Sequence, residues 1–135
     1  MNIKRLTTIE EALTLIPWEH EIQQKGRVSC PIQRLLVTIR DHIDNPMFII
    51  LFAHDKGKPL GFCISIISKK DKLIYILRMY GSGLVEHFLN ELIQLGKGYH
   101  VNKFFFTVEN GMKAIERKYG FKQVSVNMDG EGGLR

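Results

Sequence analysis

The stretch LIYILRMYGSGLVEHFLNEL, residues 73–92, decides the fold. Residues 73–77 form an apolar run of strand length, and residues 84–95 repeat apolar side chains at helical spacing. The short sequence Gly-Ser-Gly lies between them at positions 81–83. The stretch therefore predicts a strand that turns tightly into the N-terminus of a helix.

A second apolar strand is expected after this helix, over residues 101–108, which include three consecutive phenylalanines. A strand, a helix and a strand in this order predict a right-handed crossover with the two strands parallel. Further on, the pattern predicts a short helix over residues 112–118 and an alternating strand over residues 121–128. The Gly-rich tail, residues 129–135, is expected to be loose.

Two more apolar runs precede the deciding stretch, at residues 47–53 and 60–67. Charged connections that are too short for a helix separate these runs from each other and from residues 73–77. The three runs therefore predict an antiparallel meander. Because they are almost continuously hydrophobic, the sheet should be covered on both faces.

Two helices are expected before the meander. Thr7 and Thr8 are each followed three residues later by a glutamate, which is the capping-box pattern of a helix start, and Pro17 ends or kinks this helix. Pro31 suits the first turn of a second helix, which Asn45-Pro46 stops. Together the elements predict an α/β fold with two N-terminal helices and one mixed sheet, in which an antiparallel meander is followed by a βαβ crossover.

Length and composition limit the kind of protein. The 135 residues, 44% hydrophobic and 24% charged, are typical of one globular domain over residues 1–135. The N-terminus does not read as a secretion signal, and no apolar run is long enough to cross a membrane, so we expect a cytoplasmic protein without membrane contact. Cys30 and Cys63 lie in apolar surroundings without metal-ligand spacing, which predicts reduced core residues and no metal site.

The net charge of +5 favours a negatively charged ligand or partner without identifying it. Nucleic acid is one possibility, and its contacts would be sought in the charged turn at residues 69–72 and among later basic residues (Lys113, Arg117, Lys118 and Lys122). Charged turns are more often solvated edges of a sheet, so nucleic acid is not the favoured partner.

The Gly-Ser-Gly sequence is a second place where an anion would bind. Glycines there let backbone N–H groups converge at a helix N-terminus, and Arg78 beside them could hold a phosphate. Such a connection is more often a simple turn, and the glycine spacing matches neither GxxxxGK[ST] nor GxGxxG. A simple turn and an anion site therefore both stay open.

With this order of elements, three motifs resemble the GNAT superfamily of N-acyltransferases. Arg78-x-x-Gly81-x-Gly83 matches the family motif [QR]xxGx[GA]. Leu60-Gly61-Phe62 resembles the strand before the family's cofactor strand, and RKYGF at residues 117–121 resembles the ending after its last helix. The motifs occur in the family's order, and the resemblance, which implies a GNAT-like fold, spans nearly the whole chain.

The resemblance implies a site for acetyl-coenzyme A (acetyl-CoA) and transfer of its acetyl group to an amine. The pyrophosphate would lie on backbone amides of the Gly-rich loop, and the pantetheine arm would run along the preceding strand. A backbone N–H near the end of that strand would face the thioester carbonyl. The residues expected to bind the cofactor are Leu77, Arg78, Met79, Gly81, Ser82 and Gly83.

The sequence also departs from the family's pattern. Residues 73–77 contain no carboxylate where many members carry a catalytic Glu, and Glu116 stands where many carry a Tyr that protonates the leaving thiolate. The predicted strand runs almost directly into Arg78, which indicates a tighter loop. The remaining candidates for acid–base chemistry are Tyr75, Tyr80, Glu109 and Glu116.

Structural roles are the alternatives for these candidates. Tyr75 is also typical of a half-buried strand aromatic, Glu109 of a helix cap, and Glu116 of a solvated helix surface. The motif does not name the acceptor, so a small-molecule or a protein amine remains open, as do a monomer and a homodimer. A second hypothesis is a GNAT-like domain that has lost the chemistry and binds a protein or nucleic-acid partner.

Overall fold

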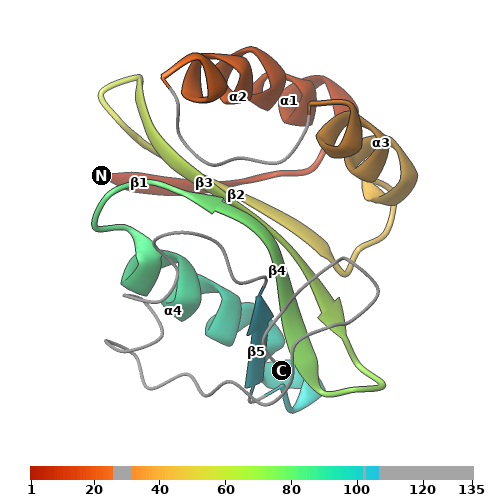
Figure 1. Ribbon diagram of the computed structural model, residues 1–135. Helices are drawn as coiled ribbons and strands as arrows, with labels where there is room; N and C mark the ends of the chain where they lie inside the picture. Colours follow the sequence, from red (N-terminus) through yellow and green to blue (C-terminus); the bar gives the residue numbers. More distant parts are fainter. Residues whose placement is uncertain (26–31, 102, 107–135) are drawn as a thin grey trace.

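A five-stranded mixed sheet forms the centre of the structure, a computed structural model that describes residues 1–25, 32–101 and 103–106. Neighbouring strands follow one another in chain order: β1 (Asn2–Leu6), β2 (Phe48–Asp55), β3 (Lys58–Ser68), β4 (Leu73–Tyr80) and β5 (Lys103–Phe106). The first four strands are antiparallel to their neighbours, and β5 is parallel to β4 (Figure 1). The predicted meander and parallel crossover are confirmed.

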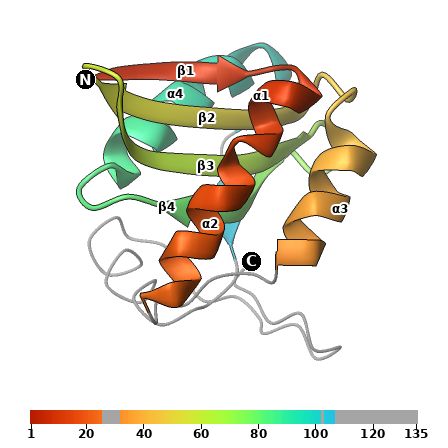
Figure 2. The ribbon, with the colours of Figure 1, turned by 90° about the horizontal axis from the view of Figure 1, so that it is seen from above.

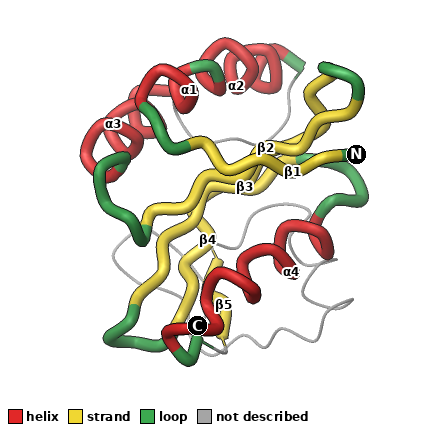
Figure 3. The backbone as a smooth tube through the Cα atoms, turned by 180° about the vertical axis from the view of Figure 1, so that it is seen from behind, coloured by secondary structure: helices red, strands yellow, loops and turns green. Residues whose placement is uncertain are grey.

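Helices cover both faces of this sheet. The first three, α1 (Ile9–Leu13), α2 (Leu15–Gln24) and α3 (Ile32–His42), lie on one face, as Figure 2 shows from above. The fourth, α4 (Val85–Gly96), lies on the opposite face and leads through a short 3₁₀ turn, Lys97–Tyr99, toward β5 (Figure 3). The sheet is thus the middle of three layers.

Two apolar cores result, one on each face. The core on the α4 side includes Ile49, Leu51, Ala53, Cys63, Ile74, Ile76, Phe88 and Leu92. The core under α1 to α3 includes Ala12, Leu15, Ile22, Leu35, Ile39, Ile50, Phe62 and Ile64. The predicted covering of both faces is confirmed. Cys63 is a free thiol within the first core, and burial raises its pKa to about 12, so this cysteine acts as a small apolar side chain.

Strand β1 was not predicted from the sequence. It pairs with β2 along its whole length, from Asn2 opposite His54 to Leu6 opposite Ile50. Its pattern of apolar residues is interrupted by Lys4. Charged residues are common on edge strands because they discourage pairing with other chains, and the same property weakens the sequence signal.

Two predicted boundaries are wrong. The N-terminal helix is interrupted at Thr14, whereas Pro17 lies in the first turn of α2, where its missing N–H has no intrahelical partner to lose. The third strand of the meander does not end at Leu77 but continues to Tyr80. This second difference moves Arg78 from the expected loop into a strand.

Several expectations concern residues outside the described ranges. They are the reduced Cys30, the helix start at Pro31, the end of the strand at residues 107–108, and everything expected over residues 112–135. Within the described ranges, no helix is long and apolar enough to span a membrane. The same part of the chain has no group of three or more His, Cys, Asp or Glu side chains that would hold a metal ion.

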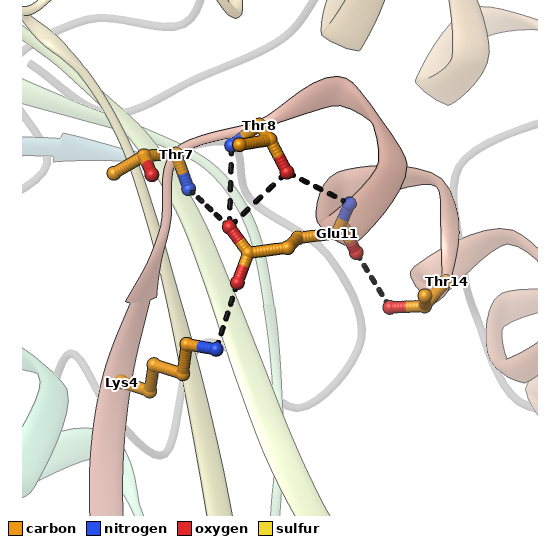
Figure 4. A network of polar contacts seen from close by, with 5 residues as sticks. All are labelled: Lys4, Thr7, Thr8, Glu11 and Thr14. Carbon is orange, nitrogen blue, oxygen red and sulfur yellow. Dashed lines mark hydrogen bonds and ion pairs between the residues drawn. The ribbon is translucent and has the colours of Figure 1, made fainter.

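A capping box fixes the start of α1 (Figure 4). The Thr8 hydroxyl accepts a hydrogen bond from the Glu11 backbone N–H at 3.2 Å, and the Glu11 carboxylate accepts one from the Thr8 backbone N–H at 3.3 Å. Lys4 on β1 places its Nζ 2.7 Å from Glu11 Oε2. The box therefore joins the start of α1 to the edge strand, and it confirms the helix start predicted from Thr8.

Two glycines hold the ends of β3 and β4 close together. A Cβ added to Gly61 would meet the Tyr80 carbonyl oxygen, and would lie 2.6 Å from Leu84 Cδ1 and 3.0 Å from the Gly81 Cα. A Cβ on Gly81 would in turn lie 3.1 Å from the Gly61 Cα. The backbones approach so closely that neither position accommodates a side chain.

We predict that Glu11→Gln reduces the acid dependence of stability. The hydrogen bond from Lys4, followed by those from Thr7 and Thr8, lowers the pKa of Glu11 from 4.5 to about 2. A carboxyl whose pKa falls on folding stabilises the protein above its unfolded pKa, and this contribution is lost as the pH falls through the folded pKa. Urea unfolding measured from pH 7 to pH 2 gives the free energy of unfolding. The values for wild type and variant should converge as the pH falls from about 4.5 to about 2.

Glu10→Gln is the matched control, because Glu10 lies in the same helical turn without taking part in the capping box. The difference in unfolding free energy between Glu10→Gln and wild type should stay flat over the same pH range. A flat difference for Glu11→Gln as well would contradict the role of the Lys4 contact.

We also predict that Gly61→Ala destabilises the fold by about 1–3 kcal/mol, the usual effect of overpacking. The added methyl group would overlap the Tyr80 carbonyl and Leu84, which are backbone and buried core respectively. Urea unfolding measures the change. As a control, Gly98→Ala adds the same methyl group where no atom of the described residues lies within 4 Å. A loss for Gly61→Ala no larger than for this control would refute the packing argument.

Candidate functional site

The connection from β4 to α4 consists of Gly81, Ser82, Gly83 and Leu84, of which the first three are called the glycine loop below. Gly81 has a φ of 137° and Gly83 a φ of 71°, values that residues with a Cβ rarely adopt. These two glycines let the chain leave the strand and enter the helix at once (Figure 1). The tight strand-to-helix turn predicted from the sequence is present.

The start of α4 offers backbone donors to a ligand. Its N-cap residue, Leu84, makes no side-chain capping hydrogen bond, and the first N–H groups of a helix lack intrahelical partners. A Cβ on Gly83 would meet no described atom within 4 Å, so the space beside the loop is open there. Together with the helix dipole, these features suit an anion, although the exposed Glu86 in the first turn opposes one.

Arg78 lies within β4, and its guanidinium is held by α2. Nε donates to Glu19 Oε1 at 3.1 Å and Nη2 donates to Glu19 Oε2 at 3.2 Å. Glu19 is completely buried and Arg78 is only 6% exposed. This placement leaves the Arg78 charge paired with Glu19 and shielded from solvent, whereas the sequence led us to expect that this side chain holds a phosphate. Removing one partner of such a pair typically costs about 3–5 kcal/mol.

Strand β4 has a bulge directly before Arg78. In the pairing with β3, Arg78 lies opposite Ile64 while Ile76 lies opposite Ser65, so Leu77 has no partner. The described pairing with β5 ends at Ile76. A bulged residue is left out of the ladder of backbone hydrogen bonds. This is the part of the strand where a donor to a thioester carbonyl was expected.

Tyr75 and Tyr80 occupy different parts of β4. Tyr75 is six residues before Gly81, which is about 20 Å along a strand. Its hydroxyl donates to Asp71 Oδ2 at 2.8 Å, and its ring packs edge-on against Phe105 at 5.3 Å. Tyr75 therefore lies away from the loop, and its contacts are those of a strand aromatic. Tyr80 is the last residue of β4 and directly precedes the glycine loop.

An aromatic cluster surrounds Tyr80 on the α2 side of the sheet. Trp18 packs edge-on against Phe52, Phe62 and Tyr80, with ring centroids 5.9, 5.3 and 5.8 Å apart. The Arg78 guanidinium carbon lies 6.0 Å from the Tyr80 ring centroid. Tyr80 thus joins the end of β4 to α2. Met79, which follows Arg78, packs on the other side against the α4 core.

The two remaining acid–base candidates, Glu109 and Glu116, lie outside the described residues. Sequence reasoning also missed Glu19, the partner of Arg78. The sequence contains a signal for this buried position. Glu19 lies four residues after Leu15 and three before Ile22, which places it on the same buried face of the helix. A carboxylate on the buried stripe of an amphipathic helix indicates a buried partner of opposite charge.

A separate cavity of about 430 Å³ lies over β1 and β2, between α1 and the turn that joins β2 to β3. Its lining residues are Lys4, Leu6, Glu11, Thr14, Phe52, His54 and Gly57. The two opposite charges in it, Lys4 and Glu11, already pair with each other. Its residues come from the edge of the sheet remote from β4, so it is not part of the site at the glycine loop.

Comparisons with known proteins point to one fold. No protein-family model and no curated protein matches the sequence. A predicted acetyltransferase from Clostridium acetobutylicum, solved with acetyl-CoA, is 14% identical with a TM-score of 0.73, over 95% of this chain and 94% of that one. The PaiA N-acetyltransferase from Thermoplasma acidophilum, in complex with coenzyme A, is 20% identical with a TM-score of 0.65, over 98% and 96%.

An aminoglycoside acetyltransferase from an uncultured soil metagenomic sample, in complex with sisomicin, is also similar. It is 15% identical with a TM-score of 0.61, over 94% of this chain and 90% of that one. At these identities the likeness concerns the fold, and it extends over nearly the whole of each chain. The chain therefore has the fold of the GNAT-like acetyltransferases.

Proposed function

We propose that this protein is an N-acetyltransferase that transfers an acetyl group from acetyl-CoA to an amine. The observation that carries the proposal is the glycine loop, which leads into the uncapped start of α4 and has no described atom within 4 Å of the Cβ position of Gly83. Backbone donors at a helix N-terminus suit the pyrophosphate of coenzyme A. Two structures of the same fold contain acetyl-CoA or coenzyme A, which supports the proposal.

Each part of the site has a role in this proposal. The backbone amides of Gly81, Ser82 and Gly83 would bind the pyrophosphate, and the strand at Leu77 and Met79 would line the path of the pantetheine arm. The backbone of the bulge at Leu77 would donate to the carbonyl oxygen, on which negative charge develops during acyl transfer. Arg78 would act from inside the protein, by fixing the strand through its pair with Glu19.

The reaction forms a C–N bond between the amine and the thioester carbonyl carbon and breaks the C–S bond. The amine loses a proton, and the leaving thiolate gains one. Tyr80 is the candidate acid in the described part of the chain, because it directly precedes the glycine loop. Glu109 and Glu116, which lie outside the residues that the structure describes, stay candidates for the base.

We further propose a small-molecule amine as the acceptor. Aminoglycoside acetyltransferases, which modify such amines, are among the proteins of similar structure. A cytoplasmic location is part of the same proposal, because Cys63 is a free thiol and cytosolic proteins keep their cysteines reduced.

Calorimetric titration with acetyl-CoA tests the binding site. We expect a dissociation constant of roughly micromolar order, about −8 kcal/mol. In Gly83→Val, affinity should fall at least tenfold, because the new side chain would fill the open space beside the backbone donors and disfavour the φ of 71°.

Gly57→Val is the matched control. Gly57 has a φ of 78°, and a Cβ there also meets no described atom within 4 Å, but this glycine lies in the turn between β2 and β3. It should bear the same backbone strain and bind acetyl-CoA like the wild type. No heat with wild-type protein up to about millimolar acetyl-CoA, together with an unshifted melting temperature, would exclude the proposed site.

A domain that binds coenzyme A without catalysis is the second candidate, and one observation favours it. The described β4, Leu73–Tyr80, carries no carboxylate that would serve as a base. The two candidates differ in the release of free coenzyme A when acetyl-CoA is mixed with a panel of small amines, including polyamines and aminoglycosides.

For the enzyme, we expect amine-dependent release of coenzyme A that Tyr80→Phe lowers at least tenfold in kcat, since positioned acid–base groups contribute about 10²–10⁴-fold. The substitution keeps the ring that packs against Trp18. Tyr75→Phe is the control, because its hydroxyl is bonded to Asp71 and lies away from the loop. Saturable binding without release for any amine would favour the binding domain.

A further inference from the structure

The buried pair of Glu19 and Arg78 lies where the proposed site needs a fixed backbone. These are the two buried charged residues of the described chain, and a pair of this kind contributes little net stability compared with apolar side chains of similar volume. Its directional bonds, however, fix the relative position of the groups they join. The pair therefore contributes more to the position of α2 and β4 than to net stability.

The pair joins the second turn of α2 to the residue directly after the β4 bulge. Both Glu19 oxygens accept hydrogen bonds from the Arg78 guanidinium, at 3.1 and 3.2 Å. The third bond of the guanidinium runs from Nη1 to the backbone carbonyl of Met79 at 3.1 Å. Arg78 thus holds the backbone of its own strand and a helix at the same time.

The bulge needs such a support. Leu77 is left out of the pairing between β4 and β3, so on that side the ladder of hydrogen bonds does not fix its peptide planes. Arg78 is the first residue after Leu77 that pairs again with β3. The guanidinium also lies 5.8 Å from the Phe62 ring centroid and 6.0 Å from that of Tyr80, which limits its movement.

We propose that Glu19 is a positioning residue for the acyl-transfer site: acting through Arg78, it fixes the β4 bulge so that a backbone N–H at Leu77 is held toward the thioester carbonyl. This inference rests on the proposed function for the role of that N–H, and on the described contacts alone for the fixing of the bulge. Glu19 itself would touch neither the acetyl group nor the amine.

The test separates positioning from stability by removing the whole pair. Glu19→Leu/Arg78→Met replaces both charges with apolar side chains of similar size, a change that cores of this kind often tolerate. Urea unfolding establishes that the double variant is folded. Glu19→Gln is a second variant, which keeps the shape of the side chain and loses its charge, and it serves if the double variant does not fold. Glu21→Gln, an exposed carboxylate on the same helix, is the control.

Two readouts decide the inference. Amide hydrogen exchange of residues 77–79 should become at least tenfold faster in the pair variants, whereas the amide of Ile50 in β2 should be unchanged. With an amine substrate, kcat should fall at least tenfold while the Kd for coenzyme A stays within about twofold. A purely structural role would lower the melting temperature without this split between kcat and binding.

The outcomes are distinct. Unchanged exchange at residues 77–79 overturns the inference whatever the kinetics show. Faster exchange with unchanged kcat also overturns it, because the bulge would then move without consequence for the reaction. If wild-type protein releases no coenzyme A with any amine, the proposed function fails, and the role of the pair in fixing the bulge is decided by the exchange measurement alone.

Discussion

The strands β2 and β3 are apolar on both faces, and the rest of the architecture follows from the need to cover both. Ile49 and Ile50 are consecutive residues, each at most 1% exposed, yet they belong to different cores. Burying one such side chain contributes about 1.5–3 kcal/mol, so neither face can be left to water. The helices α1 to α3 supply one cover and α4 the other. Because α4 has to reach the second face directly from β4, its N-terminus is placed at the end of that strand.

Charge enters this apolar arrangement at one point in the described chain, between α2 and β4. Helix α2 buries Leu15 and Ile22 on the same stripe as Glu19, so the carboxylate is carried into the core by the packing of its neighbours. A guanidinium with matching geometry helps to offset the loss of hydration of that carboxylate. The bidentate contact with Arg78 therefore restricts how α2 lies on the sheet, and Trp18, the neighbour of Glu19, fills the adjoining space with edge-on aromatic contacts.

The antiparallel meander and the parallel pairing across the crossover could be predicted from the sequence, because long apolar runs and short charged turns allow few topologies. β1 could not, since Lys4 breaks an already short pattern. Arg78 was assigned to the loop because the apolar run stops at Leu77. A charged residue that is buried in a strand needs a partner of opposite charge, and that partner, Glu19, is 59 residues away. The helix pattern around Glu19 indicates a buried partner of opposite charge, but no local pattern shows that this partner is Arg78.

The difference between local patterns and long-range contacts also explains which parts of the candidate site could be predicted from the sequence. In the proposed site the glycine loop would act through its backbone, and backbone constraints are visible in the sequence as glycines. Gly81 approaches Gly61 closely, and Gly83 has a positive φ with no described atom near its Cβ position. The role of an acid or a base, by contrast, depends on the position of its side-chain functional group in space. Tyr75 has a suitable hydroxyl but lies about 20 Å along the strand from the loop. A site built mainly from backbone donors tolerates wide divergence of side chains. This agrees with a fold shared over nearly the whole chain at 14–20% identity.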